Sequence, residues 1–205
     1  MRNLNINSKV LAGCAKILTG CALAVVCLAH IASAQAPAAA PVSTVVANPT
    51  YISIPLEITV NRPAAEVWKR IGKYCDIGEW FQIPCTITSG KDGEFGAARS
   101  VGNEILVGKT ELSYTYTQPV REGRPYNLYH GTLEARPVTA TASKLVYTLV
   151  FDNSMLADDA ARERDKAQKT AQFTRALENM KTLAEGGTLP PPPARGGQKG
   201  GPPKQ

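Results

Sequence analysis

Four tyrosines recur in predicted strands of the chain, and their spacing suits the binding of an organic molecule. Tyr114 and Tyr116 lie two positions apart in one predicted strand, and Tyr129 and Tyr147 lie in the two strands that follow. Residues two apart on a strand share one face of the sheet. Each tyrosine offers an apolar ring and one hydroxyl, so this face predicts a mostly apolar pocket with a few hydrogen-bonding groups. On the pattern alone, ordinary core residues whose hydroxyls reach solvent at a sheet edge are the favoured explanation.

The residues that most often catalyse reactions are sparse or poorly placed. His130 is the only histidine after position 34, and strand alternation places it opposite Tyr129, on the solvent face. Arg99 and Glu104 flank a Gly-Asn pair that fits a two-residue hairpin turn, which favours a surface ion pair across the hairpin. The sequence has no GxSxG, HExxH or P-loop motif, and no GxGxxG opening a helix after a strand. No catalytic residue is predicted, and hydrolase chemistry is disfavoured.

Hydrophobic periodicity predicts the elements that must position these residues. Pro55 interrupts the first alternating segment and indicates an edge strand or a bulge, because it has no N–H to donate. A turn is expected over residues 108–111. The predicted strands cover residues 52–60, 86–89, 97–101, 104–107, 112–118, 128–136 and 144–152, and the helices cover 64–71, 76–81 and 158–185. The apolar stripe of the last helix comprises Ala160, Ala167, Ala171, Phe173, Leu177, Met180 and Ala184. This order predicts an α+β domain.

The first 34 residues have the three-part layout of a secretory signal peptide. Basic residues without acidic ones precede an apolar run over residues 17–29, and Ala32-Ser33-Ala34 supplies a small-x-small cleavage site. As a helix the run reaches about 20 Å, less than the roughly 30 Å of a bilayer core. We expect cleavage after Ala34 and a periplasmic or secreted protein without a stable membrane anchor. A retained anchor and a lipoprotein signal are the alternatives.

The rest of the chain divides into a leader, one domain and a tail. Residues 35–49 are rich in Ala, Pro and Val and predict a flexible leader, and the Pro/Gly-rich residues 188–205 predict a disordered tail. Residues 50–187 suffice for one domain with a single core. Without the signal peptide and the tail the chain has 17 basic and 17 acidic residues, so no basic surface is left to bind nucleic acid.

Cys75 and Cys85 are the only cysteines after position 34. In an oxidising compartment, an even pair ten positions apart favours a disulfide. Two buried free thiols are the alternative. Because one histidine and no CxxC pair remain, a metal site is not predicted, and no cofactor is expected.

Several short segments, taken in order, resemble a known family. They are PAAEVW (63–68), residues 75–80, GAAR (96–99), SYTY (113–116), YHGTL (129–133), YTLVF (147–151) and the terminal helix. In these the chain resembles the START/Bet v 1-like (SRPBCC) superfamily, in particular exported polyketide cyclase/dehydrase-like proteins, over about residues 52–185. Tyr147 departs from this pattern, since relatives often carry tryptophan there.

The resemblance implies a helix-grip fold. In such a fold a curved antiparallel sheet of about seven strands surrounds a long C-terminal helix, two short helices follow the first strand, and an apolar cavity lies inside. Trp80 either lies at the cavity mouth or caps the core. The residues expected to contact a ligand are Trp80, Tyr114, Tyr116, Tyr129, Leu133, Tyr147, Phe151, Phe173 and Leu177.

Three functions are compatible with these expectations. The leading hypothesis is non-catalytic binding of a small hydrophobic or amphipathic molecule in the periplasm. The second is a cyclase- or dehydratase-type enzyme acting on a polyketide-like substrate, which requires an ionisable group with a shifted pKa inside the cavity. The resemblance also suggests an accessory protein of a periplasmic dehydrogenase system, with a protein partner.

Overall fold

The computed structural model describes residue 46 and residues 48–120 and 126–192. The predicted signal peptide, most of the predicted leader and residues 193–205 of the predicted tail lie outside the described residues. Leu189, at the start of the predicted tail, packs partly buried against the core. The Gln82 side chain donates to the Pro190 carbonyl at 2.6 Å.

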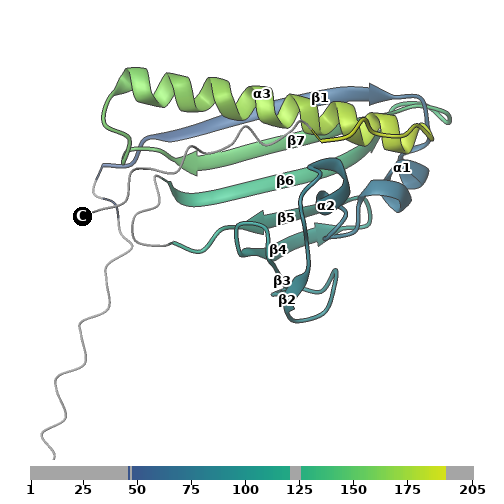
Figure 1. The fold of residues 1–205 in the computed structure, drawn as a ribbon, viewed down its shortest axis with the longest axis horizontal. Helices are drawn as coiled ribbons and strands as arrows, with labels where there is room; N and C mark the ends of the chain where they lie inside the picture. The colour runs from purple at the N-terminus through teal and green to yellow at the C-terminus, as the bar shows by residue number, and fades with distance from the viewer. Residues whose placement is uncertain (1–45, 47, 121–125, 193–205) are drawn as a thin grey trace, which may run out of the picture. The chain divides into compact units, whose positions relative to one another are not determined.

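Seven antiparallel strands form one sheet in the order β1-β7-β6-β5-β4-β3-β2 (Figure 1). The strands are β1 (Tyr51–Val60), β2 (Ile87–Ser89), β3 (Ala98–Arg99), β4 (Glu104–Thr110), β5 (Ser113–Thr117), β6 (Asn127–Pro137) and β7 (Ser143–Asp152). Two short helices, α1 (Ala64–Ile71) and α2 (Ile77–Trp80), follow β1, and the long α3 (Asp159–Ala184) closes the domain. This confirms the predicted α+β helix-grip fold.

The first strand lies at one edge of the sheet, as Pro55 indicated. Its pairing with β7 runs from Tyr51↔Asp152 to Val60↔Ser143 without a shift, and Pro55 lies opposite Thr148. The alternation of polar and apolar residues that predicted this strand therefore matches a continuous ladder.

The long helix α3 lies along β1 and β7 on one face of the sheet (Figure 1). It begins where the Asp158 carboxylate accepts the Ala161 N–H at 2.6 Å, a side-chain N-cap. Its buried residues all lie in the C-terminal half: Phe173, Ala176, Leu177, Met180 and Leu183. The predicted stripe was wrong in the N-terminal half, where Ala160, Ala167 and Ala171 are exposed. Small side chains with little apolar area to bury do not determine which face packs.

The β4–β5 hairpin differs from the prediction in its turn. We expected a turn over residues 108–111, but β4 continues to Thr110 and the chain reverses at residues 111–112. The register shifts between Leu106 and Gly108, so a bulge absorbs the break in alternation. The preceding turn has positive φ at Gly102 (61°) and Asn103 (51°), as expected, but spans four residues between the paired Arg99 and Glu104.

The disulfide between Cys75 and Cys85 is present, with 5.6 Å between the two Cα atoms. The loop that it closes contains α2, and it links the segment between α1 and α2 to the segment that precedes β2. A cross-link that closes a loop of this length removes conformational freedom mainly from the unfolded chain.

Replacing both cysteines by serine should lower the free energy of unfolding by about 2–3 kcal/mol, the loop-entropy value for a loop of this size. Urea unfolding of the mature chain measures the difference, and the parent protein under reducing conditions is the control. An unchanged unfolding midpoint in both samples would show that the cross-link does not restrict the unfolded chain.

Candidate functional site

A buried ion pair joins β3 to β4 at the centre of the site. Arg99 and Glu104 are Cα partners, and the Glu104 carboxylate oxygen Oε2 lies 2.7 Å from Arg99 Nε and 2.5 Å from Arg99 Nη2. The side chains are 0% and 5% exposed. The expected surface location was therefore wrong, because the segment between α1 and α2, through Tyr74, covers this part of the sheet. Such a pair contributes only if further partners satisfy both charges.

The Arg99 guanidinium has further partners besides Glu104, although its Nη2 atom makes no hydrogen bond among the described residues. It donates through Nη1 to the Tyr74 carbonyl. Its Cζ atom lies 4.2 Å from the centre of the Tyr74 ring, 4.9 Å from that of Tyr116 and 5.7 Å from that of Tyr114. These cation–π contacts hold three aromatic rings around one fixed charge.

Glu104 also accepts a hydrogen bond from Gln118, the residue that directly follows β5. Gln118 Nε2 donates to the second carboxylate oxygen of Glu104 at 3.0 Å. Burial raises the pKa of the Glu104 carboxyl, while the positive charge of Arg99 acts in the opposite direction.

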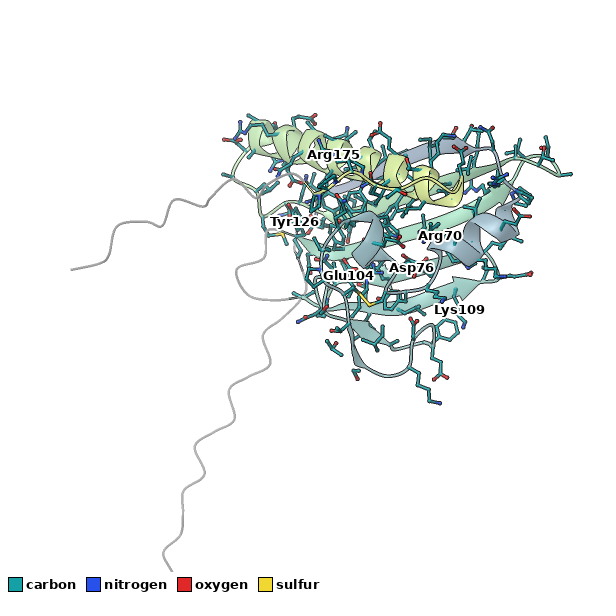
Figure 2. The ribbon with its side chains drawn as sticks, turned by 45° about the vertical axis from the view of Figure 1, so that its right-hand side comes forward. Arg70, Asp76, Glu104, Lys109, Tyr126 and Arg175 are labelled. Carbon is teal, nitrogen blue, oxygen red and sulfur yellow. A yellow bond between two sulfur atoms is a disulfide. The ribbon has the colours of Figure 1, made fainter. Side chains whose placement is uncertain are left out.

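A space that we call the inner cavity, of about 210 Å³, lies on the α3 side of this pair. Glu104 and Tyr126 lie on the same side of the domain in Figure 2 and both line the cavity. The principal lining residues are Glu104, Tyr116, Tyr126, Tyr129, Lys169 and Phe173. The cavity thus combines phenol rings with one acidic and one basic side chain.

Lys169 is the candidate site residue that the sequence reasoning missed. Its side chain is 13% exposed, and its ammonium lies 2.7 Å from the Tyr126 hydroxyl and 3.3 Å from Asp165. The same hydroxyl donates to Asp165 at 2.5 Å. Burial lowers the pKa of Lys169, and Asp165 partly opposes that shift. Asp165 and Lys169 precede Phe173 at intervals of four, so they share its helix face, and this spacing was the available signal.

The nine predicted ligand-contacting residues are all buried, but they are not all in one place. Tyr116, Tyr129 and Phe173 line the inner cavity. Trp80 lies beside a groove of about 410 Å³ between α2 and α3, and Tyr114 lines a separate pocket beside α1. Four of the nine predicted residues line none of these three spaces: Leu133, Tyr147, Phe151 and Leu177. Much of the expected cavity is therefore filled by packed side chains.

Two contacts fix the orientation of Tyr116 at the cavity wall. The Tyr147 hydroxyl donates to the Tyr116 hydroxyl at 2.9 Å. A Cβ atom on Gly131 would lie 2.4 Å from the Tyr116 ring, so the ring packs directly on the backbone of β6. Burial raises the pKa of Tyr116 and of Tyr147, so both hydroxyls stay protonated near neutral pH.

His130 takes no part in this site. Its Nδ1 atom lies 2.8 Å from the Leu128 carbonyl, two residues earlier in the same strand. Within residues 48–120 and 126–192, no group of three or more His, Cys, Asp and Glu side chains could hold a metal ion. In the same part of the chain, no helix combines the length and apolar character needed to cross a bilayer.

Removing Arg99 should destabilise the domain severely. An Arg99→Met substitution leaves Glu104 buried without its cation and should cost about 3–5 kcal/mol of unfolding free energy. Adding Glu104→Gln removes the stranded charge and should recover part of that loss. A urea double-mutant cycle measures the coupling, and a double variant that loses the full sum of both single effects would contradict this account.

Lys169 should lose its proton at a lower pH than lysines in unstructured peptides, whose pKa is about 10.4. Titration by ¹³C NMR of the lysine Cε atoms measures it, and a Lys169→Met variant assigns the resonance. Between the folded and unfolded pKa values the unfolded chain binds more protons, so stability should rise with pH in that window. A Lys169 midpoint at or above the peptide value would refute the desolvation argument.

Comparison with solved structures places this fold among known proteins. A protein of Thermobifida fusca is 23% identical with a TM-score of 0.55, over 67% of this chain and 97% of that chain. The Zhui aromatase/cyclase of Streptomyces sp. R1128 is 17% identical with a TM-score of 0.53, over 68% and 100%. A Nitrosospira multiformis protein is 22% identical with a TM-score of 0.50, over 63% and 96%. At these identities the likeness shows the fold alone.

No curated protein matches the chain in sequence. A family model does match, over residues 51–185, which includes every strand and all but a short part of the described domain. Its description is "Polyketide cyclase / dehydrase and lipid transport". The match confirms the resemblance drawn from the short segments, and the chain belongs to the polyketide cyclase/dehydrase and lipid transport family.

Proposed function

We propose that the chain binds a small oxygenated aromatic molecule in the inner cavity, with Lys169 as its principal polar contact. The observation that carries this proposal is a largely buried ammonium among three phenol rings and a phenylalanine. Lys169 lies 3.9 Å from the centre of the Tyr126 ring and 5.9 Å from that of Tyr129. A hydrogen bond from a charged donor that is largely buried contributes more than one between neutral groups.

The size and charge of the inner cavity support this ligand class. Its volume of about 210 Å³ is below the range that takes drug-sized ligands, so a single ring with short substituents is favoured. Asp165 already balances the charge of Lys169, and Arg99 balances that of Glu104. An uncharged ligand with a carbonyl or phenol oxygen therefore fits better than a carboxylate.

Proton transfer of the cyclase/dehydratase kind is the second candidate function. The lowered pKa of Lys169 favours it, because a neutral amine is a base. In this reaction the Lys169 amine removes a proton from the carbon beside a ligand carbonyl, and the electron pair of that C–H bond forms an enolate. The family description and the aromatase/cyclase neighbour are consistent with such chemistry.

We also propose that binding takes place in the periplasm. The layout of residues 1–34 and the disulfide between Cys75 and Cys85 both support export to an oxidising compartment. Detection of the mature N-terminus at Gln35 by mass spectrometry of the exported protein would test this proposal.

One experiment tests binding and catalysis together. The probe is 2,4-dihydroxyacetophenone in D₂O, followed by calorimetry for binding and by ¹H NMR for exchange of its acetyl protons. Lys169→Met should weaken binding about tenfold or more, the loss expected for a hydrogen bond to a charged group. Lys166→Met, an exposed lysine one turn away, is the matched control.

The two readouts separate the candidates. Acetyl exchange that depends on Lys169 and not on Lys166 would establish proton transfer. Saturable binding without exchange would leave the binding function alone. If neither variant changes the affinity, or if no binding occurs, Lys169 is not the ligand contact and the proposal fails.

A further inference from the structure

A second concave space, which we call the α1 pocket, lies beyond the buried ion pair. It occupies about 660 Å³ between the end of α1, the loop over residues 90–95 and the β4–β5 hairpin. Lys109, on its rim, lies toward the opposite end of β4 from Glu104 (Figure 2). The α1 pocket and the inner cavity share no lining residue.

Arg99 and its aromatic neighbours separate the two spaces. Tyr114 lines the α1 pocket and Tyr116 lines the inner cavity, and both rings contact the Arg99 guanidinium. Because the buried Arg99 holds both rings in place between the two spaces, the α1 pocket is a distinct compartment and not an extension of the inner cavity.

The floor of the α1 pocket is aromatic and rigid. The Tyr114 ring lies 5.7 Å from the Trp68 ring and 5.5 Å, edge-on, from the Tyr74 ring. A Cβ atom on Gly72 would lie 2.4 Å from the Trp68 indole, so that ring packs directly on the end of α1. Rings fixed in this way favour a flat ring system as their ligand.

Two buried hydroxyls on the floor, those of Tyr74 and Tyr114, lack a hydrogen-bond partner among the described residues. The Tyr74 side chain is 1% exposed, and its hydroxyl has no hydrogen bond among the described residues. A buried hydroxyl without a partner is costly, and a ligand oxygen would remove that cost.

The rim adds apolar area and a balanced charge. Phe95 is 64% exposed at the pocket edge, where its ring adds apolar area to the rim. Lys109 is held by the Gly93 carbonyl at 2.6 Å. The charged lining residues are two lysines and two acids, Lys73, Lys109, Asp92 and Glu111. This balance favours an uncharged ligand.

We propose that the α1 pocket is a second ligand site that binds an uncharged, flat molecule of two or three fused rings carrying one hydroxyl or carbonyl oxygen. The ring system lies on Trp68 with Tyr114, whose ring plane is inclined by 53° to the indole, against its edge. The oxygen bonds the Tyr74 hydroxyl, and Phe95 covers the outer edge. The volume falls within the range of sites for drug-sized molecules.

The test uses 2-naphthol and naphthalene as matched probes, titrated into the mature chain and followed by amide NMR. We expect 2-naphthol to shift amides around Trp68 and Tyr74. Tyr74→Phe should weaken 2-naphthol about fivefold and leave naphthalene unchanged, because only the hydrogen bond is lost. Phe95→Ala should weaken both probes about fivefold, and Val138→Ala, another exposed apolar residue, should weaken neither.

Three outcomes would overturn the proposal. They are the absence of saturable shifts, shifts confined to amides around Tyr129 and Lys169, and an equal effect of Tyr74→Phe on both probes. Because the two spaces share no residue, failure here would leave the test of Lys169 in the inner cavity unaffected.

Discussion

The arrangement of the domain depends on burying the charge of Arg99. A guanidinium loses its hydration when it is fully covered, and only a precise set of partners makes this tolerable. Glu104, the Tyr74 carbonyl and three tyrosine rings provide that set. They come from β4, β5 and the segment after α1, so one charge ties together elements that the chain connects only at a distance. The concave face of the sheet is divided at the same point, with a small polar compartment on one side and a larger aromatic one on the other.

The sequence was sufficient to predict the order of the elements but not the surroundings of Arg99. Strand alternation identifies which residues share a face. Because β3 has only two residues, alternation cannot tell which of its faces is buried and which is exposed. Whether Arg99 is exposed depends on the segment between α1 and α2 that covers it, and the contacts of Tyr74 with Arg99 span 25 positions in the sequence. A surface ion pair is also the commoner arrangement for Arg and Glu, so the expectation followed the general preference of these residues.

The candidate site, like the ion pair, could be predicted from the sequence only in part. The tyrosine face was predictable because tyrosines at alternate positions stand out, and Tyr116 and Tyr129 do line a cavity. Lys169 was not predicted because a lysine in a helix rich in Lys, Arg and Glu resembles its solvated neighbours. Its burial becomes apparent only in the folded chain, where the hydroxyl of Tyr126, 43 positions earlier, accepts its hydrogen bond. Leu133, Tyr147, Phe151 and Leu177 show why alternation overestimates a cavity, since it cannot distinguish a lining residue from a packed one.

The proline in the edge strand has a consequence for the protein at high concentration. The ladder between β1 and β7 continues through Pro55 without a shift, so the proline nitrogen faces outward. A ten-residue edge of this kind is otherwise a template on which another chain adds a strand. An added strand would find no donor at Pro55 and would leave one of its carbonyls unpaired in the middle of the new ladder. The proline therefore disfavours edge-to-edge strand addition and fibre formation at β1, although β1 is a long edge strand.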